Sequence, residues 1–137
     1  PAVTALLTRE RSAAASDVDK GQYLKFDDRG LIPAIAQEAE TGEVLMMAWM
    51  NAESIRETIE TGRVVYWSRS RANLWRKGDT SGHIQSLVDL RFDWYRDCIL
   101  LMGEQIGAAC HTFRKSCFYT AVRNDAEVEL MKPMANV

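Results

Sequence analysis

The chain has 137 residues, 47% of them hydrophobic, which suits one domain with a sizeable core. Its 17 basic and 19 acidic residues give a formal net charge of −2, which argues against a general binder of nucleic acid or of anionic membranes. No apolar run approaches the ~20 residues of a membrane-spanning helix, and three cysteines without the pattern of an export signal lead us to expect reduced thiols in the cytoplasm.

The first forty residues are expected to hold a lead-in segment and two strands. Residues 1–20 are rich in alanine and serine, and we expect them to be mobile or helical, ahead of a single domain over residues 21–137. The stretch YLKFDDRGLIPAIAQEA, residues 23–39, predicts a strand, a turn over residues 27–30 and a second strand. Pro33 indicates that this second strand either lies at a sheet edge or has just begun, because proline cannot donate to a strand ladder.

A further strand and a helix follow. Gly42 favours a turn, and the apolar run VLMMAWM over residues 44–50 has the length of a strand. Asn51 is a favourable N-cap, and residues at helical spacing follow it. Gly62 then supplies the stop signal, so we expect the helix to end at residues 61–62.

The second half of the chain is predicted to be mainly strands. Residues 63–70 (RVVYWSRS) have β character, whereas residues 71–83 predict a short helix that opens into a loop. Residues 83–95 and 98–105 predict either a strand pair or one long bent strand, and residues 110–122 predict another strand. Several short strands with one clear helix indicate a β-rich α+β domain.

The segment ACHTFRKSCF places Cys110 and Cys117 close to His111 and to the cations Arg114 and Lys115. Zinc knuckles have cysteines two to four residues apart, which this pair does not match. The pair alone therefore leaves three interpretations open: a metal site, a redox pair, or structural cysteines packed as small hydrophobic side chains. The neighbouring cations would lower the thiol pKa and favour thiolates.

A second polar stretch, YWSRSRANLWRKGDTSGHIQ over residues 66–85, concentrates hydroxyls, glycines and basic side chains. Clustered donors and an approachable backbone are what a phosphate pocket needs. Trp67 and Trp75 beside the cations favour a pocket for a phosphorylated aromatic ligand. The alternative is an ordinary solvated basic loop.

Two carboxylates, Asp93 and Asp97, are also candidates for a metal site. In an extended strand, positions 93, 95 and 97 share one face. Two carboxylates on one face suit a hard cation such as Mg²⁺. The alternative is that both are ordinary surface acids.

Several of these stretches, in this order and at these separations, resemble the phosphoribosyl-AMP cyclohydrolase family of histidine biosynthesis. The resemblance runs from about Leu24 to Tyr119 and is carried by GLIPAIAQEAETGEVLMMAWMN, TGRVVYWSRSR, LWRKGDTSGHIQ and ACHTFRKSCF. It implies a cytoplasmic homodimer with an intertwined, β-rich α+β fold of mostly antiparallel strands and one or two short helices. It also implies a small-molecule substrate, with hydrolysis of the N1–C6 bond of the adenine ring in 1-(5-phosphoribosyl)-AMP. We expect neither a nucleic-acid nor a membrane partner.

The resemblance further implies zinc held by three cysteines, one of them from the partner subunit, beside magnesium held by aspartates. The matching residues in this chain are Cys110 and Cys117 for zinc and Asp93 and Asp97 for magnesium. A zinc-bound water becomes hydroxide near neutral pH and can attack an electrophilic ring carbon.

Two histidines and a set of polar side chains complete the candidate site. His83 and His111 are the candidates for proton transfer. The expected substrate contacts are Ser68, Arg69, Ser70, Arg71, Trp75, Lys77, Thr80, Ser81, Gln85 and Arg114.

The chain departs from the family pattern in its metal motif. The family sequence Asp-Cys-Asp-x-Asp is here Asp93-Trp94-Tyr95-Arg96-Asp97, so a tryptophan replaces the third zinc cysteine and a tyrosine the middle aspartate. Phe113 stands where the family usually has glycine. Zinc therefore lacks its third ligand, and the magnesium site is weakened. These departures leave an alternative open: a divergent paralogue, low in zinc or inactive, that binds a phosphorylated nucleotide without efficient turnover.

Two other residues could supply the third zinc ligand. Cys98 shares a strand face with position 94, but on an extended strand it lies ~13 Å further along. His111 is adjacent to Cys110 and would point to the opposite face if the backbone is extended there.

Overall fold

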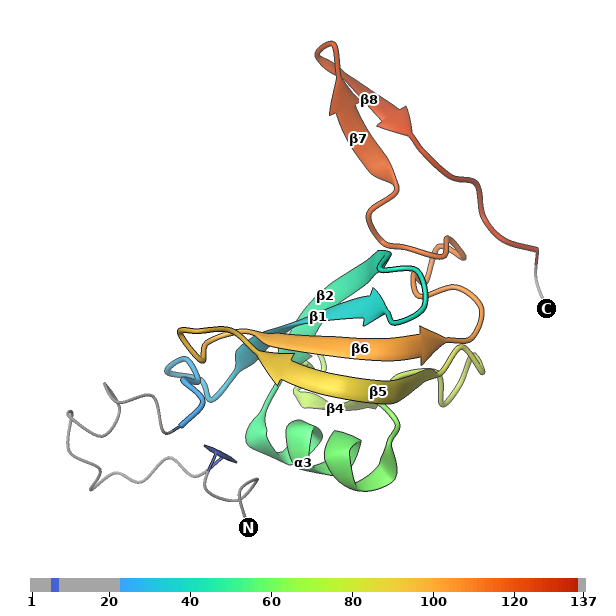
Figure 1. Cartoon of the computed structure of the whole chain (residues 1–137). Coiled ribbons are helices and arrows are strands. Elements are labelled where there is room, and N and C mark those ends of the chain that lie inside the picture. The colour runs from blue at the N-terminus through green and yellow to red at the C-terminus, as the bar shows by residue number, and fades with distance from the viewer. Residues whose placement is uncertain (1–5, 8–22, 136–137) are drawn as a thin grey trace.

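The computed structural model describes residues 6–7 and 23–135, and its main body is a curled six-stranded sheet with one helix packed against it (Figure 1). The strand order is β4-β3-β2-β1-β6-β5, and β7 and β8 form a separate hairpin that projects from the body. β1 and β6 pair in parallel, whereas the other neighbouring strands are antiparallel. The elements are β1 (Ile32–Glu38), β2 (Val44–Met50), α3 (Ala52–Thr61), β3 (Val65–Ser68), β4 (Asn73–Arg76), β5 (Gln85–Phe92), β6 (Ile99–Gln105), β7 (Thr120–Arg123) and β8 (Ala126–Glu129).

This architecture confirms the prediction of a β-rich α+β domain with mostly antiparallel strands. The expected lead-in over residues 1–20 lies almost wholly outside the described residues. Among the residues that the structure describes, no helix is long and apolar enough to cross a membrane.

The helix begins and ends where its capping residues predict. The Asn51 side chain accepts from the Ser54 backbone N–H at 2.8 Å, and the Ser54 hydroxyl accepts from the Asn51 N–H at 2.9 Å, a reciprocal capping box. Gly62 ends the helix in the left-handed region, with φ 75°. Thr58 accepts from the Val65 backbone N–H at 2.9 Å and so attaches α3 to β3.

The core lies between the sheet and α3. In β1 the residues alternate between buried and half-buried, as expected for a strand with one face in the core. The largest side chains that are almost fully buried are Tyr66, Ile32, Leu45, Met50, Ile55, Ile99 and Leu101.

Near the start of the described chain, the turn over residues 27–30 is confirmed, but the strand predicted before it is wrong. Asp27 Oδ1 accepts from the Leu31 N–H at 2.8 Å and closes the turn. Leu24 and Phe26 are buried without belonging to a strand. The backbone N–H groups of Leu24 and Lys25 donate to the carbonyls of Leu6 and Arg96, neither of which lies in a strand. Pro33 is the second residue of β1, so its place at a strand beginning is confirmed; the strand itself is central.

The short helix predicted within residues 71–83 is also wrong, because β4 occupies Asn73–Arg76. β4 pairs with β3 across a turn that contains Ala72 at φ 48°. The Trp75 ring packs on Tyr66 with 5.4 Å between ring centroids. This contact between strands favours the hairpin over a helix that would have had no apolar face to bury.

The strand predicted over residues 110–122 is a strand only from Thr120 onward. Residues 108–117, called the cysteine loop below, are folded into turns. Of the two alternatives for residues 83–105, the strand pair is confirmed, since β5 and β6 are antiparallel neighbours joined by residues 93–98, called the aspartate turn below.

Candidate functional site

A cavity of about 580 Å³ lies between two parts of the chain. One part is the β3–β4 hairpin together with the residues that follow β4, and the other is the cysteine loop. This cavity is called the main cavity below. Its wall brings together eight of the residues predicted from the sequence: Arg71, Trp75, Lys77, Thr80, Ser81, His83, Cys110 and His111. Segments far apart in the sequence therefore meet at one site.

The cysteine loop owes its shape to backbone hydrogen bonds. The Cys110 N–H donates to the Arg114 carbonyl at 3.1 Å, and the Phe113 N–H donates to the Cys110 carbonyl at 3.0 Å. At its far end the loop is attached to β2, since the Cys117 N–H donates to the Leu45 carbonyl at 2.7 Å. The turns bring the Cys110 and Cys117 thiols close enough for each to shift the pKa of the other, despite their separation in the sequence.

The two thiols differ in their electrostatic surroundings. Burial works to raise the pKa of Cys110, but hydrogen bonds from Thr112 and Cys117 and the charge of Lys77 outweigh it and lower the pKa. The Thr112 hydroxyl lies 3.0 Å from the Cys110 sulfur. Burial and the hydrogen bond with Cys110 raise the pKa of Cys117 to about 11. Cys110 is therefore the more easily ionised thiol of the pair.

Lys77 is the buried cation of the site. Its ammonium group donates to the Ala109 carbonyl at 2.7 Å and lies 5.4 Å from the centroid of the Trp75 ring. Burial lowers the pKa of Lys77, while the nearby Cys117 and Cys110 sulfurs act in the opposite direction. A buried ammonium beside two thiols stabilises a thiolate.

Two of the glycines that follow β4 are required by the shape of the site. At Gly78, with φ 86°, an added Cβ would lie 2.5 Å from the Ile84 backbone nitrogen. The segment can double back here only because glycine has no side chain. The turn carries Thr80, Ser81 and His83 into the cavity wall. Gly107 comes just before the cysteine loop, and a Cβ added there would lie similarly close to the His83 ring.

Four other predicted contacts lie away from this wall. Ser68 and Ser70 lie at the β3–β4 turn with their hydroxyls 3.4 Å apart, and the Arg69 guanidinium packs over Trp49 at 4.7 Å. Gln85 is buried in the core, where its Oε1 accepts from the Tyr66 hydroxyl at 2.6 Å. The structure thus gives Gln85 an interior partner.

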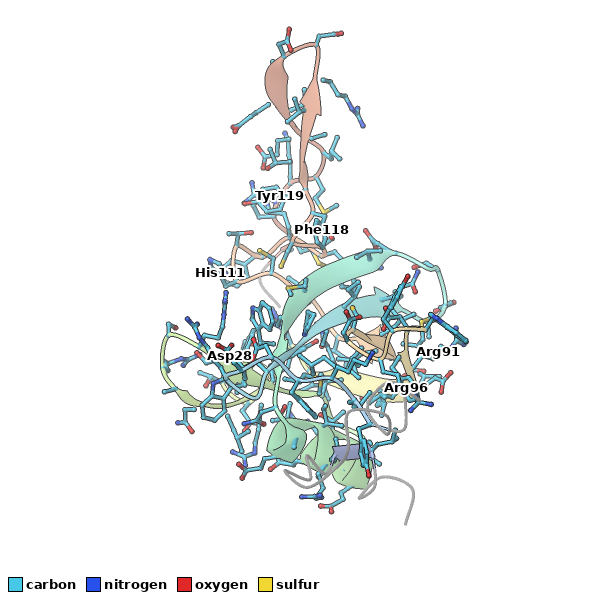
Figure 2. The ribbon with its side chains drawn as sticks, turned by 90° about the vertical axis from the view of Figure 1, so that its left-hand side faces the viewer. Asp28, Arg91, Arg96, His111, Phe118 and Tyr119 are labelled. Atoms are coloured by element: carbon cyan, nitrogen blue, oxygen red, sulfur yellow. The ribbon has the colours of Figure 1, made fainter. Side chains whose placement is uncertain are left out.

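Arg114 is engaged with the hairpin and the tail. Its guanidinium pairs with Glu129 on β8, stacks over the Tyr119 ring at 4.4 Å and donates to the Met131 carbonyl at 3.5 Å. Figure 2 shows Tyr119 at the base of the projecting hairpin, above His111 on the cysteine loop. Arg114 therefore joins the cysteine loop to the hairpin.

The aspartates and Cys98 lie in the aspartate turn, not in a strand, so the premise of a shared strand face is wrong. Asp93 Oδ1 accepts from the backbone N–H groups of Asp97 at 3.1 Å and Cys98 at 3.3 Å, which folds the chain back on itself. The ~13 Å separation of Cys98 from position 94 assumed an extended strand and does not apply. The opposite-face argument for His111 fails for the same reason, since its backbone lies in a turn.

The aspartate turn precedes β6 and the cysteine loop follows it, so the two lie at opposite ends of that strand (Figure 1). Within the described part of the chain, no group of three or more His, Cys, Asp or Glu side chains could hold a metal ion. One subunit therefore presents a pair of thiols and, far from it, a pair of carboxylates.

Part of the cavity wall was missed by sequence reasoning. Leu74, Gly78, Asp79 and Ala108 also line it. Three of them are apolar or glycine, the Asp79 carboxylate is paired with Arg63, and Leu74 reaches the wall only because β4 is a strand. The sequence signal that could have found them is the turn chemistry of Gly78 and Gly82, which predicts a tight reversal between β4 and β5.

Comparison with known proteins gives matches to one family. Residues 46–119 match the family model described as phosphoribosyl-AMP cyclohydrolase. The phosphoribosyl-AMP cyclohydrolase of Dinoroseobacter shibae is 66% identical over 111 residues, which are 81% of this chain and 93% of that protein. A Cereibacter sphaeroides protein of the same name is 67% identical over 111 residues, with the same coverage. Another, from Paracoccus denitrificans, is 63% identical over 110 residues, 80% of this chain and 91% of that protein.

Proposed function

The chain belongs to the phosphoribosyl-AMP cyclohydrolase family, and we propose that it hydrolyses the N1–C6 bond of the adenine ring in 1-(5-phosphoribosyl)-AMP. This reaction opens the ring to the phosphoribosyl-formimino-carboxamide nucleotide, a step of L-histidine biosynthesis. The observation that carries the proposal is the main cavity, where the Cys110 thiol, two histidines and a buried cation meet beside an aromatic wall. The small-molecule substrate and the reduced thiols fit an enzyme of the cytoplasm.

The cavity wall suits the two ends of such a substrate. Arg71 and Lys77 supply positive charge for phosphate, and Thr80 and Ser81 supply hydroxyls for phosphate or ribose. Trp75 offers an aromatic surface for the adenine ring. The nearby Arg76 is already occupied, because it makes two hydrogen bonds to Glu57.

We propose that Cys110 and Cys117 hold zinc. Two neighbouring thiols can share one soft ion, and the charge of Lys77 favours the ionised form that binds metal. Bound zinc would lower the pKa of a water molecule and so supply the nucleophile for C6. The remaining residues orient the substrate, and His83 and His111, both in the cavity wall, would move protons between water and the ring nitrogen.

A third zinc ligand from a second copy of the chain would complete the site. The aspartate turn is exposed, with Trp94 91% exposed, so it can approach the cysteine loop of another subunit. Cys98 lies in this turn beside Asp93, and burial followed by the charges of Asp93 and Asp97 raises the pKa of its thiol. In a homodimer, Cys98 would take the role of the cysteine that Trp94 replaces. Asp93 and Asp97 would hold magnesium, weakly.

The test is the zinc content of the purified protein together with turnover of phosphoribosyl-AMP, with and without added zinc. We expect about one zinc per subunit and turnover that a chelator abolishes and zinc restores. Cys110→Ser should lose both zinc and turnover, and Cys98→Ser should weaken zinc binding. A wild-type protein that is saturated with zinc and binds the substrate, yet does not turn it over, would support the paralogue interpretation.

That alternative, a homologue that binds a nucleotide without efficient turnover, is not favoured. The chain is 63–67% identical to several relatives whose names state the activity. Two of the expected cations, two hydroxyls, both histidines and the Cys110 thiol line one cavity.

A further inference from the structure

The His83 side chain stands at the junction of two cavities. A second cavity of about 380 Å³ adjoins the main cavity, and the walls of both include Ser81, His83, Ala108 and Phe113. Gly107 and Met134 complete the second cavity on the side of the C-terminal tail. Rotation of the imidazole would therefore turn it from one cavity toward the other.

The backbone of His83 is held in place from two sides. Its N–H donates to the Ser81 hydroxyl at 3.1 Å, and its carbonyl accepts from Gln105 Nε2 at 3.2 Å. With the backbone fixed, the direction of the imidazole depends on the side chains that touch the ring.

Gly107 touches one side of the ring. A Cβ added at Gly107 would lie 2.6 Å from His83 Cδ2 and 2.9 Å from Nε2, well inside van der Waals contact. The imidazole thus fills the space that any other residue at position 107 would occupy. The φ of Gly107 is +68°, so a side chain here would also strain the backbone.

Phe113 touches the ring from the cysteine loop. Its ring meets the imidazole edge-on, with 6.4 Å between centroids and an interplanar angle of 83°. The φ of Phe113 is +67°, a region that large L-residues rarely adopt. Hydrogen bonds from the Phe113 N–H to the Cys110 carbonyl and from the Met134 N–H to the Phe113 carbonyl fix this conformation. A strained backbone fixed on both sides is typical of a residue with a functional task.

We propose that Phe113 and Gly107 are positioning residues that hold the His83 imidazole in one direction at the junction of the two cavities. Gly107 leaves the space for the ring, and Phe113 packs edge-on against it. The proposal rests on the proposed function only for its effect on turnover, because the orientation of the ring can be measured without substrate.

The first experiment compares Gly107→Ala with Gly30→Ala in the full chain. Gly30 has φ +78° but nothing within 4 Å of an added Cβ, so it reproduces the backbone strain without the collision. We expect Gly107→Ala to lower kcat by roughly 10- to 100-fold with a much smaller change in KM, because a displaced proton-transfer group affects the reacting geometry more than binding. Gly30→Ala should match the wild type. An equal loss in both variants, or none in Gly107→Ala, would overturn the proposal.

The second experiment follows the imidazole signals by NMR, which only two histidines contribute. His111→Asn assigns the His111 signal and so leaves the other to His83. Phe113→Leu should shift the His83 signals, because it removes the ring current, and it should lower kcat. Phe113→Tyr should keep the His83 signals and kcat near their wild-type values. Unchanged His83 signals in Phe113→Leu would contradict the contact. If neither the wild type nor any variant hydrolysed phosphoribosyl-AMP, the proposed function would fail. The NMR result would still decide whether Phe113 positions the His83 imidazole.

Discussion

Tyr66 connects the core of the domain to the cavity wall. Its hydroxyl donates to Gln85 Oε1 at 2.6 Å in the interior, and its ring packs on Trp75, which lines the main cavity. Gln85 Nε2 in turn lies 3.3 Å from the Met46 sulfur, so both polar ends of the glutamine are occupied. Gln85 therefore fixes the sheet behind the site, and its effect on substrate would be indirect.

Tyr66→Phe should destabilise the fold by about 1–3 kcal/mol, because it leaves the buried Gln85 oxygen without a donor. Urea denaturation measures this loss, and Tyr95→Phe, at a side chain that is 66% exposed, is the control with the same chemical change. An equal loss in both variants would show that the buried hydrogen bond contributes little.

Burial of the Tyr66 hydroxyl also predicts that stability depends on pH. Burial raises the pKa of Tyr66 above its ordinary value, so the folded protein keeps the proton that the unfolded chain releases near pH 10. The contribution of the neutral hydroxyl to the free energy of unfolding is therefore complete below pH 10, and it decreases as the pH rises further. The difference in stability between wild type and Tyr66→Phe should narrow above pH 10 in urea denaturation.

Between elements, one ion pair joins the helix to the hairpin that carries the site. Arg76 on β4 makes hydrogen bonds of 2.6 and 2.8 Å to the Glu57 carboxylate on α3. The hydrogen bond from Arg76 lowers the pKa of Glu57. Both side chains are partly exposed, so solvent screening limits the contribution of the pair.

Glu57→Gln should lower thermal stability slightly at neutral pH and progressively less as the pH falls below 4.5. A lowered carboxyl pKa contributes stability above the ordinary pKa of 4.5, and this stability is lost as the pH falls and the folded protein also takes up the proton. Melting curves of both proteins across pH measure the difference. Ile55→Ala, a cavity-forming change expected to cost about 2–5 kcal/mol, should be destabilising at every pH. A Glu57→Gln effect that is equally large at pH 3 would contradict the assignment to charge.

How well sequence reasoning predicted each element depended on how local its signals are. α3 was predicted closely because Asn51 and Gly62 mark its ends within the sequence. β4 was missed because its stability comes from Tyr66 on another strand. The shape of the cysteine loop was missed because it depends on a hydrogen bond from Cys117 to Leu45, far away in the chain.

The contrast between local signals and distant contacts also applies to the candidate site. Motif resemblance selected eight residues that share the wall of the main cavity. It could not tell that Gln85 faces the core or that Arg114 faces the hairpin, because those directions are set by partners elsewhere in the chain. The contact between Gly107 and His83 is likewise invisible in the sequence.

At the scale of the molecule, two features point to association. The β7–β8 hairpin projects from the body and exposes apolar side chains, with Val122 78% exposed and Val128 37% exposed (Figure 1). The thiol pair and the aspartate turn lie at opposite ends of β6, so a shared metal site needs a second copy. A homodimer in which the hairpin of each subunit packs on the other would satisfy both features.

We therefore expect analytical ultracentrifugation at micromolar concentration to give a mass of about twice the 15.5 kDa of one chain. Val122→Asp should produce a folded monomer, because an aspartate is tolerated at a position that is exposed in one subunit and is costly in an apolar interface. Val88→Asp, on the edge strand β5 and 57% exposed, distinguishes the two possible surfaces. If Val88→Asp yields monomer while Val122→Asp stays dimeric, the subunits meet along β5. Because the third zinc ligand is assigned to a second copy, the monomeric variant should also hold less zinc than the dimer.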